Sequence, residues 1–340
     1  MFGALFPGQG SQHVGMADFL LEGFPRAKHV FEEASDAIGV DLVKMVTEGD
    51  EATLALTENT QPALVTMSFA VFRVLKDMCD GNLDITAGAG HSVGEYSALA
   101  CSGAITLTDA VKLVRLRGQL MQQAVPVGTG GMMAVIGMPA DDVLKLCAWT
   151  VEKSGLGPVE PANYNSPAQT VISGSAEALK WLKEKFEQYK SGENTNKIKL
   201  IPLKVSAPFH CSLMRPAEAK MKEAIESTTF HAPQWGIIQN YTASLEKDPD
   251  VLRVNLVKQI SGAVRWTECM QTLKAQDVRS VAEFGPGRVL TGLLKKIDPE
   301  AFSPFNLNSV GELNSFENHI EARIESEKRK KMMEEAMDED

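Results

Sequence analysis

The sequence predicts an α/β protein in which a small domain interrupts a larger one. Residues 128–206 contain predicted elements in the order strand, helix, strand, strand, helix, strand, which is the split βαβ arrangement around an antiparallel sheet. In residues 1–127 and 207–316, on either side, short apolar strands alternate with amphipathic helices. A chain of 340 residues is long enough to bury more than one core. We therefore expect a large domain built from both flanking regions and an inserted small domain.

The first part of the large domain begins with a strand and continues with helices. The apolar run Phe2–Phe6 ends at a Pro-Gly pair, as expected for a buried strand. Residues 62–76 are apolar on nearly all sides, which predicts a helix inside the core. Thr108 is the expected N-cap of a helix that ends near Ala124. Further helices are expected at residues 26–38, 50–57 and 92–102.

The insert, the second part of the large domain and the C-terminal tail follow in order. Inside the insert we expect strands at 132–137, 159–165, 169–174 and 198–206, helices at 140–154 and 176–189, and a loop at 191–196. After the insert we expect helices at 213–227, 248–260 and 286–296, and strands at 236–241 and 281–284. Residues 317–340 are dominated by charged side chains, which predicts a solvated helix or a disordered tail.

Composition and charge exclude several classes of protein. Hydrophobic residues make up 44% and charged residues 23% of the chain, as in soluble globular proteins. The net charge of −10 argues against nucleic-acid binding, and no apolar run is long enough to cross a membrane. No secretion signal is visible, and the five scattered cysteines form no metal-binding or disulfide pattern. We expect a cytoplasmic protein, monomeric, without a metal or another cofactor.

Residues 90–94, Gly-His-Ser-Val-Gly, fit the Gly-x-Ser-x-Gly pattern of a serine on a sharp strand-to-helix turn. The flanking glycines are required because a side chain there would collide with neighbouring backbone. The turn exposes the hydroxyl of Ser92 beside a helix N-terminus, where amides and the helix dipole can stabilise an oxyanion. The pattern alone indicates an activated serine, and it fits hydrolysis as well as acyl transfer.

A base must take the proton of the serine, and the chain has six histidines. Five of them lie on predicted polar helix faces, in loops or directly beside the serine: His13, His29, His91, His231 and His319. His210 lies where a predicted strand gives way to a helix, and strand ends are where open α/β sheets place their sites. His210 is therefore the candidate base, and a buried structural histidine is the equally weighted alternative.

Arg117 falls on the apolar stripe of the helix that follows the serine helix. A buried guanidinium needs an anionic partner, because an unpaired buried charge is destabilising by several kcal/mol. The partner is either an internal carboxylate or the carboxylate of a ligand, which the planar fork of arginine binds through two parallel hydrogen bonds. The sequence leaves both partners open.

Six motifs stand in the order seen in malonyl-CoA:acyl carrier protein transacylases, and residues 1–312 resemble this family. Each motif alone is weak, but together they are highly specific. They are Phe6-Pro-Gly-Gln-Gly-Ser-Gln12, Gly90-His-Ser-Val-Gly-Glu-Tyr-Ser-Ala98, Leu116-Arg-Gly118, Asn163-Tyr-Asn165, Pro208-Phe-His210 and Phe284-Gly-Pro-Gly-Arg-Val-Leu290.

The resemblance implies an α/β-hydrolase-like large domain, a ferredoxin-like small domain and an active site between them. It implies that Ser92 takes the malonyl group from coenzyme A, with His210 acting as base and then as acid. The acyl group then passes to the phosphopantetheine thiol of acyl carrier protein, in fatty acid biosynthesis. The main-chain N–H groups of Gln9 and Val93 are implied as the oxyanion hole.

Four further roles follow from the resemblance. Arg117 is implied to bind the free carboxylate of the malonyl group, which agrees with its place on an apolar stripe. Gln259 matches the position whose main-chain carbonyl orients the histidine, and Asn165 matches a supporting position near the site. The bulky Phe209 is typical of malonyl-selective relatives and is expected to disfavour a 2-methyl branch.

Two other functions remain open at this stage. An esterase or thioesterase uses the same serine turn, but such hydrolases usually place an Asp or Glu between serine and histidine in the chain. Asp109, Asp141 and Asp142 fall in predicted helices or in the insert, which counts against hydrolysis. A non-catalytic module that binds carrier protein is the second alternative, and the presence of both Ser92 and His210 argues against it.

Overall fold

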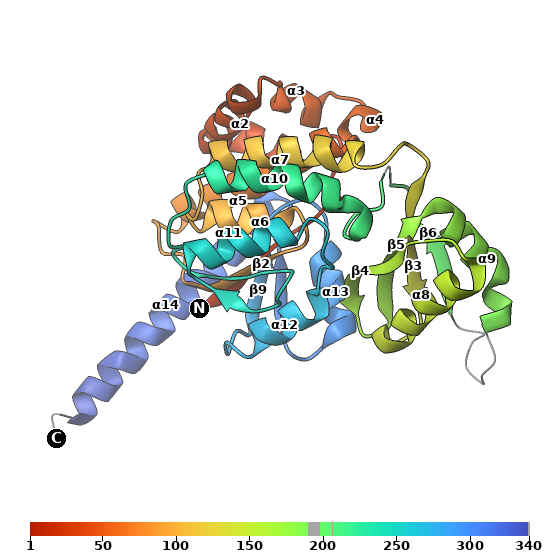
Figure 1. Cartoon of the computed structure of the whole chain (residues 1–340). Coiled ribbons are helices and arrows are strands. Elements are labelled where there is room, and N and C mark those ends of the chain that lie inside the picture. Colours follow the sequence, from red (N-terminus) through yellow and green to blue (C-terminus); the bar gives the residue numbers. More distant parts are fainter. Residues whose placement is uncertain (190–197, 206, 339–340) are drawn as a thin grey trace.

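The computed structural model describes residues 1–189, 198–205 and 207–338. It has a mixed α/β fold with two separate sheets (Figure 1). The loop predicted at 191–196 lies outside the described residues. Within the described part of the chain, no helix combines the length and apolar character that crossing a bilayer requires.

The larger sheet positions the loops that carry the predicted serine. Its strands follow the spatial order β10-β9-β1-β2-β7-β8, and only β7 and β8 pair antiparallel. Phe6 pairs with Gly90, so β1 and β2 end side by side, at the edge where open parallel sheets place their sites. The strands are β1 (Phe2–Phe6), β2 (Ile85–Gly90), β7 (Gly236–Ile238), β8 (Leu245–Glu246), β9 (Ser280–Glu283) and β10 (Ser303–Asn306).

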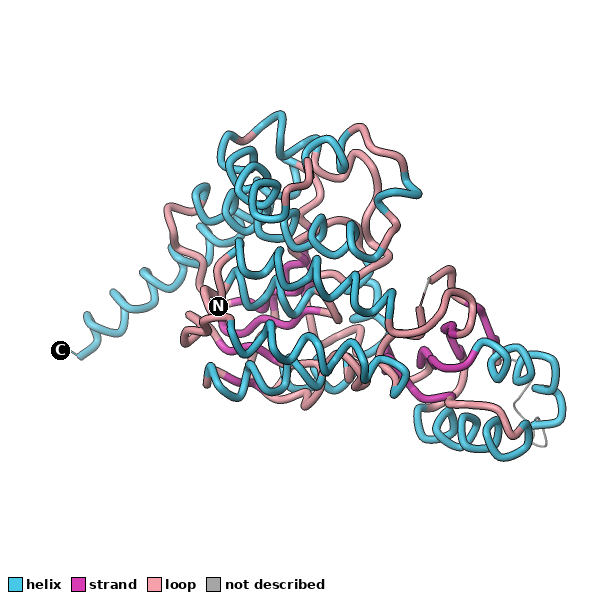
Figure 2. Tube along the Cα trace, turned by 45° about the horizontal axis from the view of Figure 1, so that its top comes forward, coloured by secondary structure: helices cyan, strands magenta, loops and turns pink. Residues whose placement is uncertain are grey.

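Helices cover both faces of this sheet (Figure 2). Alternate side chains of β1 point to opposite faces of the sheet and enter two different hydrophobic cores. Ala4 and Phe6 belong to one core, and Leu5 belongs to the other. The Leu5 side is covered by α12 (Trp266–Lys274) and α13 (Val289–Ile297). The other side is covered by α1 (Asp18–Gly23), α2 (Pro25–Ile38), α3 (Leu42–Thr47), α4 (Glu51–Leu54), α5 (Thr57–Met78), α6 (Gly94–Cys101), α7 (Leu107–Gln123), α10 (Arg215–Ser227) and α11 (Pro249–Lys258).

The smaller sheet is antiparallel throughout, with the order β4-β5-β3-β6. Met133 and Val135 point toward the helices α8 and α9, whereas Met132 and Ala134 belong to the core of the larger part. The sheet therefore lies between its own two helices and the rest of the molecule (Figure 1). Its elements are β3 (Gly130–Ile136), α8 (Ala140–Ser154), β4 (Val159–Ser166), β5 (Gln169–Ser175), α9 (Ala176–Tyr189) and β6 (Lys199–Pro202).

The predicted starts of two helices that follow the serine turn are wrong. The N-cap of α7 is Thr106, whose hydroxyl accepts a hydrogen bond from the main-chain N–H of Asp109, and Thr108 lies inside the helix. The helix expected to begin at Pro286 begins at Val289, after a turn with glycines at positive φ. It starts there because the buried carboxylate of Glu283 accepts the N–H groups of its first turn.

Helix α5 is longer than the predicted helix at 62–76 and contains Pro62 inside it. Proline cannot donate to the carbonyl four residues earlier, which is that of Glu58. The guanidinium of Arg115 on α7 donates to this carbonyl at 2.9 Å, so the freed acceptor stays satisfied. This contact between α5 and α7 thus replaces the main-chain hydrogen bond that Pro62 cannot make.

The charged tail is helical. Helix α14 (Val310–Asp338) begins before the predicted tail, and its first turns bury Leu313, Phe316 and Ile320. The rings of Phe2 and Phe316 meet edge to face at 5.0 Å. Beyond these turns the helix extends away from the body of the molecule (Figure 1).

Candidate active site

Ser92 lies on the turn between β2 and α6, where the Gly-x-Ser-x-Gly pattern places it. Its φ is +54°, in the left-handed region that residues other than glycine rarely adopt. A Cβ at Gly94 would lie 2.1 Å from the main-chain oxygen of Phe6, and one at Gly90 would lie 1.9 Å from the main chain of Gly94. Both glycines are therefore required for β1, β2 and α6 to pack this closely around the serine.

His210 meets Ser92 although 118 residues separate them, with Nε2 2.6 Å from the serine Oγ. Its Nδ1 lies 2.9 Å from the main-chain oxygen of Gln259 and 3.1 Å from that of Gly262. Carbonyl oxygens only accept hydrogen bonds, so Nδ1 carries the ring proton. Nε2 is then free to accept the proton of the serine hydroxyl.

The surroundings of His210 keep its ring neutral. Burial of the ring, together with the positive charge of Arg117, lowers the pKa of His210 to about 3. A neutral imidazole at pH 7 can accept a proton. The Ser92–His210 pair therefore has the protonation state that attack on an acyl carbon requires.

Arg117 reaches the serine from α7 and is 1% exposed. Its Nη2 lies 3.2 Å from the Ser92 Oγ and 3.0 Å from Oε1 of Gln259, and its Nη1 lies 2.9 Å from Oε1 of Gln61. Burial lowers the pKa of Arg117, but the ordinary pKa of a guanidinium is so high that it stays charged. The acceptors of these hydrogen bonds are uncharged, but the buried carboxylate of Glu95 attracts the guanidinium and opposes the lowering of its pKa. An internal carboxylate therefore acts on Arg117, and a ligand carboxylate stays the second possible partner.

Gln259 at the end of α11 touches all three of these residues. Its main-chain oxygen accepts from His210, its side-chain Oε1 accepts from Arg117, and its Nε2 donates to the main-chain oxygen of Ser92 at 2.8 Å. The carbonyl contact agrees with the expectation from the resemblance. The two side-chain contacts were not predicted, and nothing in the local sequence signals them.

The remaining predicted residues lie around this centre. Val93 is buried at the start of α6, directly after the serine. The loop that contains Gln9 packs on the serine turn, since a Cβ at the neighbouring Gly8 would lie 2.6 Å from the main-chain oxygen of His91. Phe209 is 8% exposed beside the base. These positions are compatible with the predicted roles.

Asn165 contacts the serine turn at His91 rather than at the serine itself. It lies on β4 in the smaller sheet, and its Oδ1 is 2.8 Å from Nε2 of His91. The ring of His91 thus points toward the smaller sheet, whereas the neighbouring Ser92 contacts His210. The two neighbours point apart, which is why His91 does not serve the serine as a base in this structure.

Sequence reasoning missed a second layer of buried polar residues behind the serine. Asn240 contacts both flanks of the turn, and Glu95 on α6 accepts hydrogen bonds from the segment that contains Asn240. Both side chains are fully buried. The only available signal was Glu95, the one charged residue of α6.

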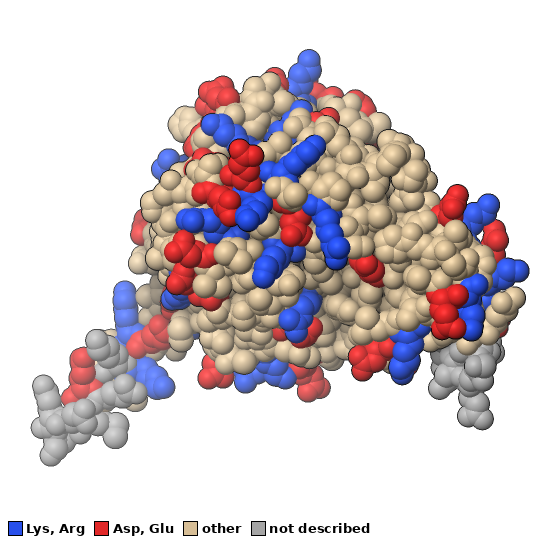
Figure 3. Space-filling model, viewed as in Figure 1, with Lys and Arg blue, Asp and Glu red and all other residues tan. Residues whose placement is uncertain are grey.

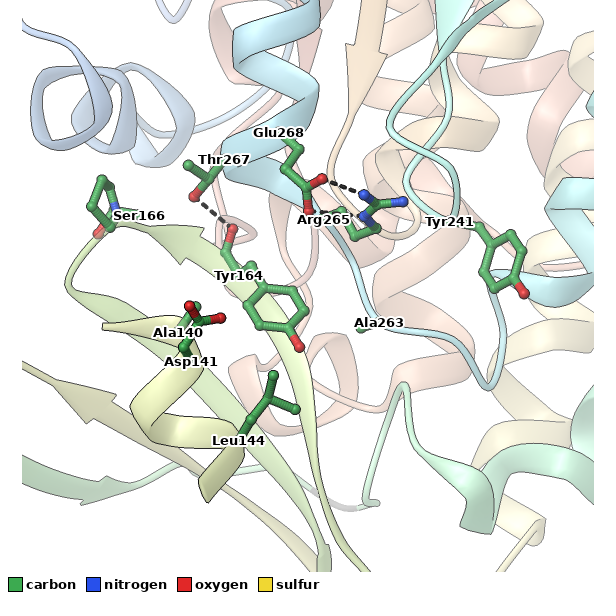
Figure 4. Close-up of a pocket in the computed structure, with 11 residues that line it drawn as sticks. Ala140, Asp141, Leu144, Tyr164, Ser166, Tyr241, Ala263, Arg265, Thr267 and Glu268 are labelled. Atoms are coloured by element: carbon green, nitrogen blue, oxygen red, sulfur yellow. Dashed lines mark hydrogen bonds and ion pairs between the residues drawn. The ribbon is translucent and has the colours of Figure 1, made fainter. Parts of the chain in front are cut away.

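A separate pocket of about 480 Å³ lies where the smaller sheet meets the larger part (Figure 4). Tyr164 and Leu144 line it from the side of β4 and α8, and Arg265 and Glu268 line it from the opposite side as an ion pair. None of the predicted site residues lines this pocket. This pocket is therefore separate from the predicted serine site.

The charged side chains over α10 and α11 are mixed in sign (Figure 3). Lys222 pairs with Glu226 at 3.7 Å, and Arg253 pairs with Asp250 at 3.3 Å. Interleaved charges of this kind form no continuous basic surface on this face.

Comparison with known proteins gives a consistent result. Residues 4–300 match the family described as the acyl transferase domain. The malonyl CoA-acyl carrier protein transacylase of Salmonella typhimurium is 42% identical over 297 residues, which are 87% of this chain and 92% of that protein. The crystal structure of FabD from Acinetobacter baumannii has a TM-score of 0.87 at 42% identity and covers 95% of this chain and 98% of its own. A type II PKS malonyl-transacylase in complex with its acyl-carrier protein has a TM-score of 0.85 at 39% identity, covering 92% and 98%.

Proposed function

The chain belongs to the acyl transferase family, and from this membership we propose that it is a malonyl-CoA:acyl carrier protein transacylase of fatty acid biosynthesis. It moves the malonyl group from coenzyme A to the phosphopantetheine thiol of acyl carrier protein through an ester on Ser92. One observation supports the choice of acyl group. The buried guanidinium of Arg117 lies 3.2 Å from the Ser92 hydroxyl, and its described hydrogen-bond acceptors are uncharged. A free acyl carboxylate is an anion that this guanidinium can bind directly beside the serine.

The first half-reaction loads the serine. The Ser92 Oγ attacks the thioester carbonyl of malonyl-CoA while His210 Nε2 takes the hydroxyl proton. The carbonyl oxygen becomes an oxyanion, which the main-chain N–H groups of Gln9 and Val93 stabilise. When the carbon–sulfur bond breaks, His210 returns the proton to the leaving thiolate, and coenzyme A departs as a thiol.

The second half-reaction is the reverse with a different thiol. The phosphopantetheine thiol of acyl carrier protein gives its proton to His210 and attacks the malonyl ester. The carbon–oxygen bond to Ser92 then breaks, and His210 protonates the Ser92 Oγ. Each half-reaction moves one acyl group and one proton without oxidation or reduction. The proposed mechanism therefore contains no cofactor, and malonyl-CoA is a substrate.

Arg117 selects the acyl group. The malonyl carboxylate lies two carbons beyond the ester oxygen, and Nη2 of Arg117 already contacts that oxygen in the free serine. The planar guanidinium can donate two parallel hydrogen bonds to the two oxygens of a carboxylate. Phe209 restricts the space beside His210 and disfavours a 2-methyl branch, and Asn165 supports the serine turn through His91.

We extend the proposal to the domains. Residues 1–127 and 207–316 form an α/β-hydrolase-like catalytic domain, residues 128–206 a ferredoxin-like domain, and residues 317–340 a charged tail. The strand order β4-β5-β3-β6 with two helices on one face supports the ferredoxin-like assignment. The protein is proposed to work as a cytoplasmic monomer, with no nucleic acid or membrane as partner.

Intact-mass measurement tests the reaction. The protein mixed with malonyl-CoA is expected to gain one malonyl group, and Ser92→Ala is expected to gain none. Addition of acyl carrier protein should then discharge the ester far faster than water does. Normal malonylation of Ser92→Ala, or a rate of malonyl-CoA loss that does not depend on acyl carrier protein, contradicts the proposal and favours a hydrolase.

A further inference from the structure

The serine turn needs an external support because its backbone is strained. Ser92 has a φ of +54°, which for a residue with a Cβ is unfavourable by roughly 1 kcal/mol or more. Strained residues persist when their surroundings determine the conformation. The turn also contains a partly buried N–H at Ser92 and a buried carbonyl at Gly90, and each requires a partner.

Asn240 supplies both partners with one side chain. It follows β7, the strand next to β2, and is fully buried. Its Oδ1 accepts from the main-chain N–H of Ser92 at 2.7 Å, and its Nδ2 donates to the main-chain oxygen of Gly90 at 2.7 Å. The amide therefore bridges the two flanks of the turn and fixes the direction in which the serine leaves the strand.

The hydrogen bond from the Ser92 N–H to Asn240 also decides which amides can stabilise an oxyanion. The N–H of Ser92 is occupied by Asn240, so it does not face the substrate. The oxyanion is left to other amides, which agrees with the proposed pair at Gln9 and Val93. Without Asn240 the N–H of Ser92 would be released at the point where the acyl group sits.

The buried carboxylate of Glu95 holds Asn240 in place. Its Oε2 accepts from the main-chain N–H of Asn240 at 2.8 Å and from Nε2 of Gln259 at 3.2 Å. Its Oε1 accepts from Nε2 of Gln239 at 3.2 Å. Glu95 thus ties the end of β7 and the residue that orients the base to the first turn of α6, the helix that begins at the serine turn.

We propose that Asn240, anchored by Glu95, is a positioning residue that sets the rate of attack by Ser92. This role rests on the proposed function only in that Ser92 is the nucleophile. It predicts a loss in the rate of acylation without a matching loss in affinity, because Arg117 and the malonyl carboxylate do not touch Asn240.

The first test replaces Asn240 by Ala. The first-order rate of malonyl-enzyme formation, measured by rapid quench and mass spectrometry, is expected to fall about 100-fold or more, because both hydrogen bonds that hold the serine turn are lost. The malonyl-CoA concentration for half-maximal rate is expected to change less than about threefold. A wild-type rate, or a loss confined to that concentration, contradicts the proposal.

Asn255→Ala is the matched control. Asn255 is a buried amide of the same network, but it donates to Oε1 of Gln239 and does not touch the serine turn. It is expected to lower the melting temperature to a similar extent and to keep the acylation rate within about threefold of wild type. Equal rate losses in Asn240→Ala and Asn255→Ala would show that Asn240 acts through stability alone.

Asn240→Asp provides a variant of nearly unchanged shape and a pH readout. A protonated Asp can still accept from Ser92 and donate to Gly90, whereas an ionised Asp presents a second acceptor to the Gly90 carbonyl. The ionisable groups that face this position are Glu95 on α6 and Cys269 on α12, and burial raises the pKa of both. The Cys269 thiol is uncharged across the pH range of this test, so an ionised Glu95 is the group that opposes a negative charge there. The acylation rate relative to wild type is therefore expected to fall as pH rises, and a constant ratio from pH 5.5 to 9 contradicts the role.

A fluorophosphonate separates this proposal from the proposed function. The reagent phosphonylates any activated serine, with loss of fluoride, whatever acyl group the enzyme uses. Wild-type protein that reacts with the fluorophosphonate but not with malonyl-CoA overturns the malonyl assignment alone. Equal phosphonylation rates in wild type and Asn240→Ala overturn the role of Asn240 alone.

Discussion

Arg117→Gln is the perturbation that tests the electrostatics of the site most directly. Nη2 of Arg117 and Nε2 of His210 contact the same Ser92 Oγ at 3.2 and 2.6 Å, so the two nitrogens lie within about 6 Å of each other. At an effective dielectric constant of about 20, two unit charges at this distance interact by roughly 3 kcal/mol. This is equivalent to about two pH units in the pKa of His210. Removal of the guanidinium should raise that pKa from about 3 toward 5.

The sign of the effect is fixed by the role of the base. His210 must be neutral to take the serine proton, so the acylation rate falls at pH values below its pKa. With acetyl-CoA, which has no carboxylate to lose a partner, Arg117→Gln is expected to show an acidic limb near pH 5 in kcat/KM. Wild type has its limb about two pH units lower. The assay is quench-flow acylation between pH 4 and 9, a range in which Arg117→Gln is expected to show an acidic limb and wild type is expected to show none.

Arg117→Lys is the control that keeps the charge. Its acidic limb is expected to stay near that of wild type, although its malonyl loading suffers from the loss of the planar fork. For malonyl-CoA, Arg117→Gln should lower kcat/KM by about 10²- to 10³-fold, because the substrate carboxylate is buried without its partner. An acidic limb at the same pH in both variants would refute the electrostatic reasoning, and equal losses for malonyl-CoA and acetyl-CoA would show that Arg117 is structural.

Three further outcomes follow from the same geometry. Gly94→Ala should lower the melting temperature and abolish fluorophosphonate labelling, because its Cβ would lie 2.1 Å from the main-chain oxygen of Phe6; Gly131→Ala, whose Cβ would have 3.6 Å to its nearest neighbour, is the control. Phe209→Ser should raise the methylmalonyl-to-malonyl ratio of kcat/KM by about 10-fold or more, measured in competition; an unchanged ratio means that Phe209 does not limit the branch. Burial lowers the pKa of folded His210 to about 3, so below pH 6.5 the unfolded histidine binds a proton that the folded one does not. His210 alone should therefore lower the free energy of unfolding by up to about 1.4 kcal/mol for each pH unit below 6.5. In denaturant titrations, His210→Gln should show a shallower pH dependence of this free energy.

The parts of the fold that sequence predicts well are those with a local signal. The apolar run Phe2–Phe6 forms β1 over the predicted residues, and the predicted helix at 140–154 has those bounds in α8. Elements with a weak pattern escaped prediction, such as the edge strand Ser303–Asn306, which is only partly buried and has no apolar alternation. Helix α12 also escaped, although Trp266, Met270 and Leu273 recur on one face.

The residues of the candidate site also differ in whether the local sequence signals them. Ser92 and Arg117 each have a local signature, a glycine-flanked turn and a charge on an apolar stripe. Asn240 has none, because both of its contacts with the serine turn join residues 148 to 150 positions apart. Only the three-dimensional arrangement shows that an amide after β7 supports a turn after β2.

The hydrogen-bond acceptors of Arg117 connect selectivity to base strength. They are the amides of Gln61 and Gln259 and the serine hydroxyl, and the buried carboxylate of Glu95 offsets part of the charge of Arg117. The ring of His210 is oriented by two main-chain carbonyls, which add no negative charge, whereas an Asp in that place would offset more of the charge of Arg117. The remaining charge of the guanidinium lowers the pKa of His210 until an acyl carboxylate binds. A malonyl group offsets that charge and strengthens the base when the proton must move, and an acetyl group does not. Discrimination between the two should consequently appear in the rate of acylation as well as in binding.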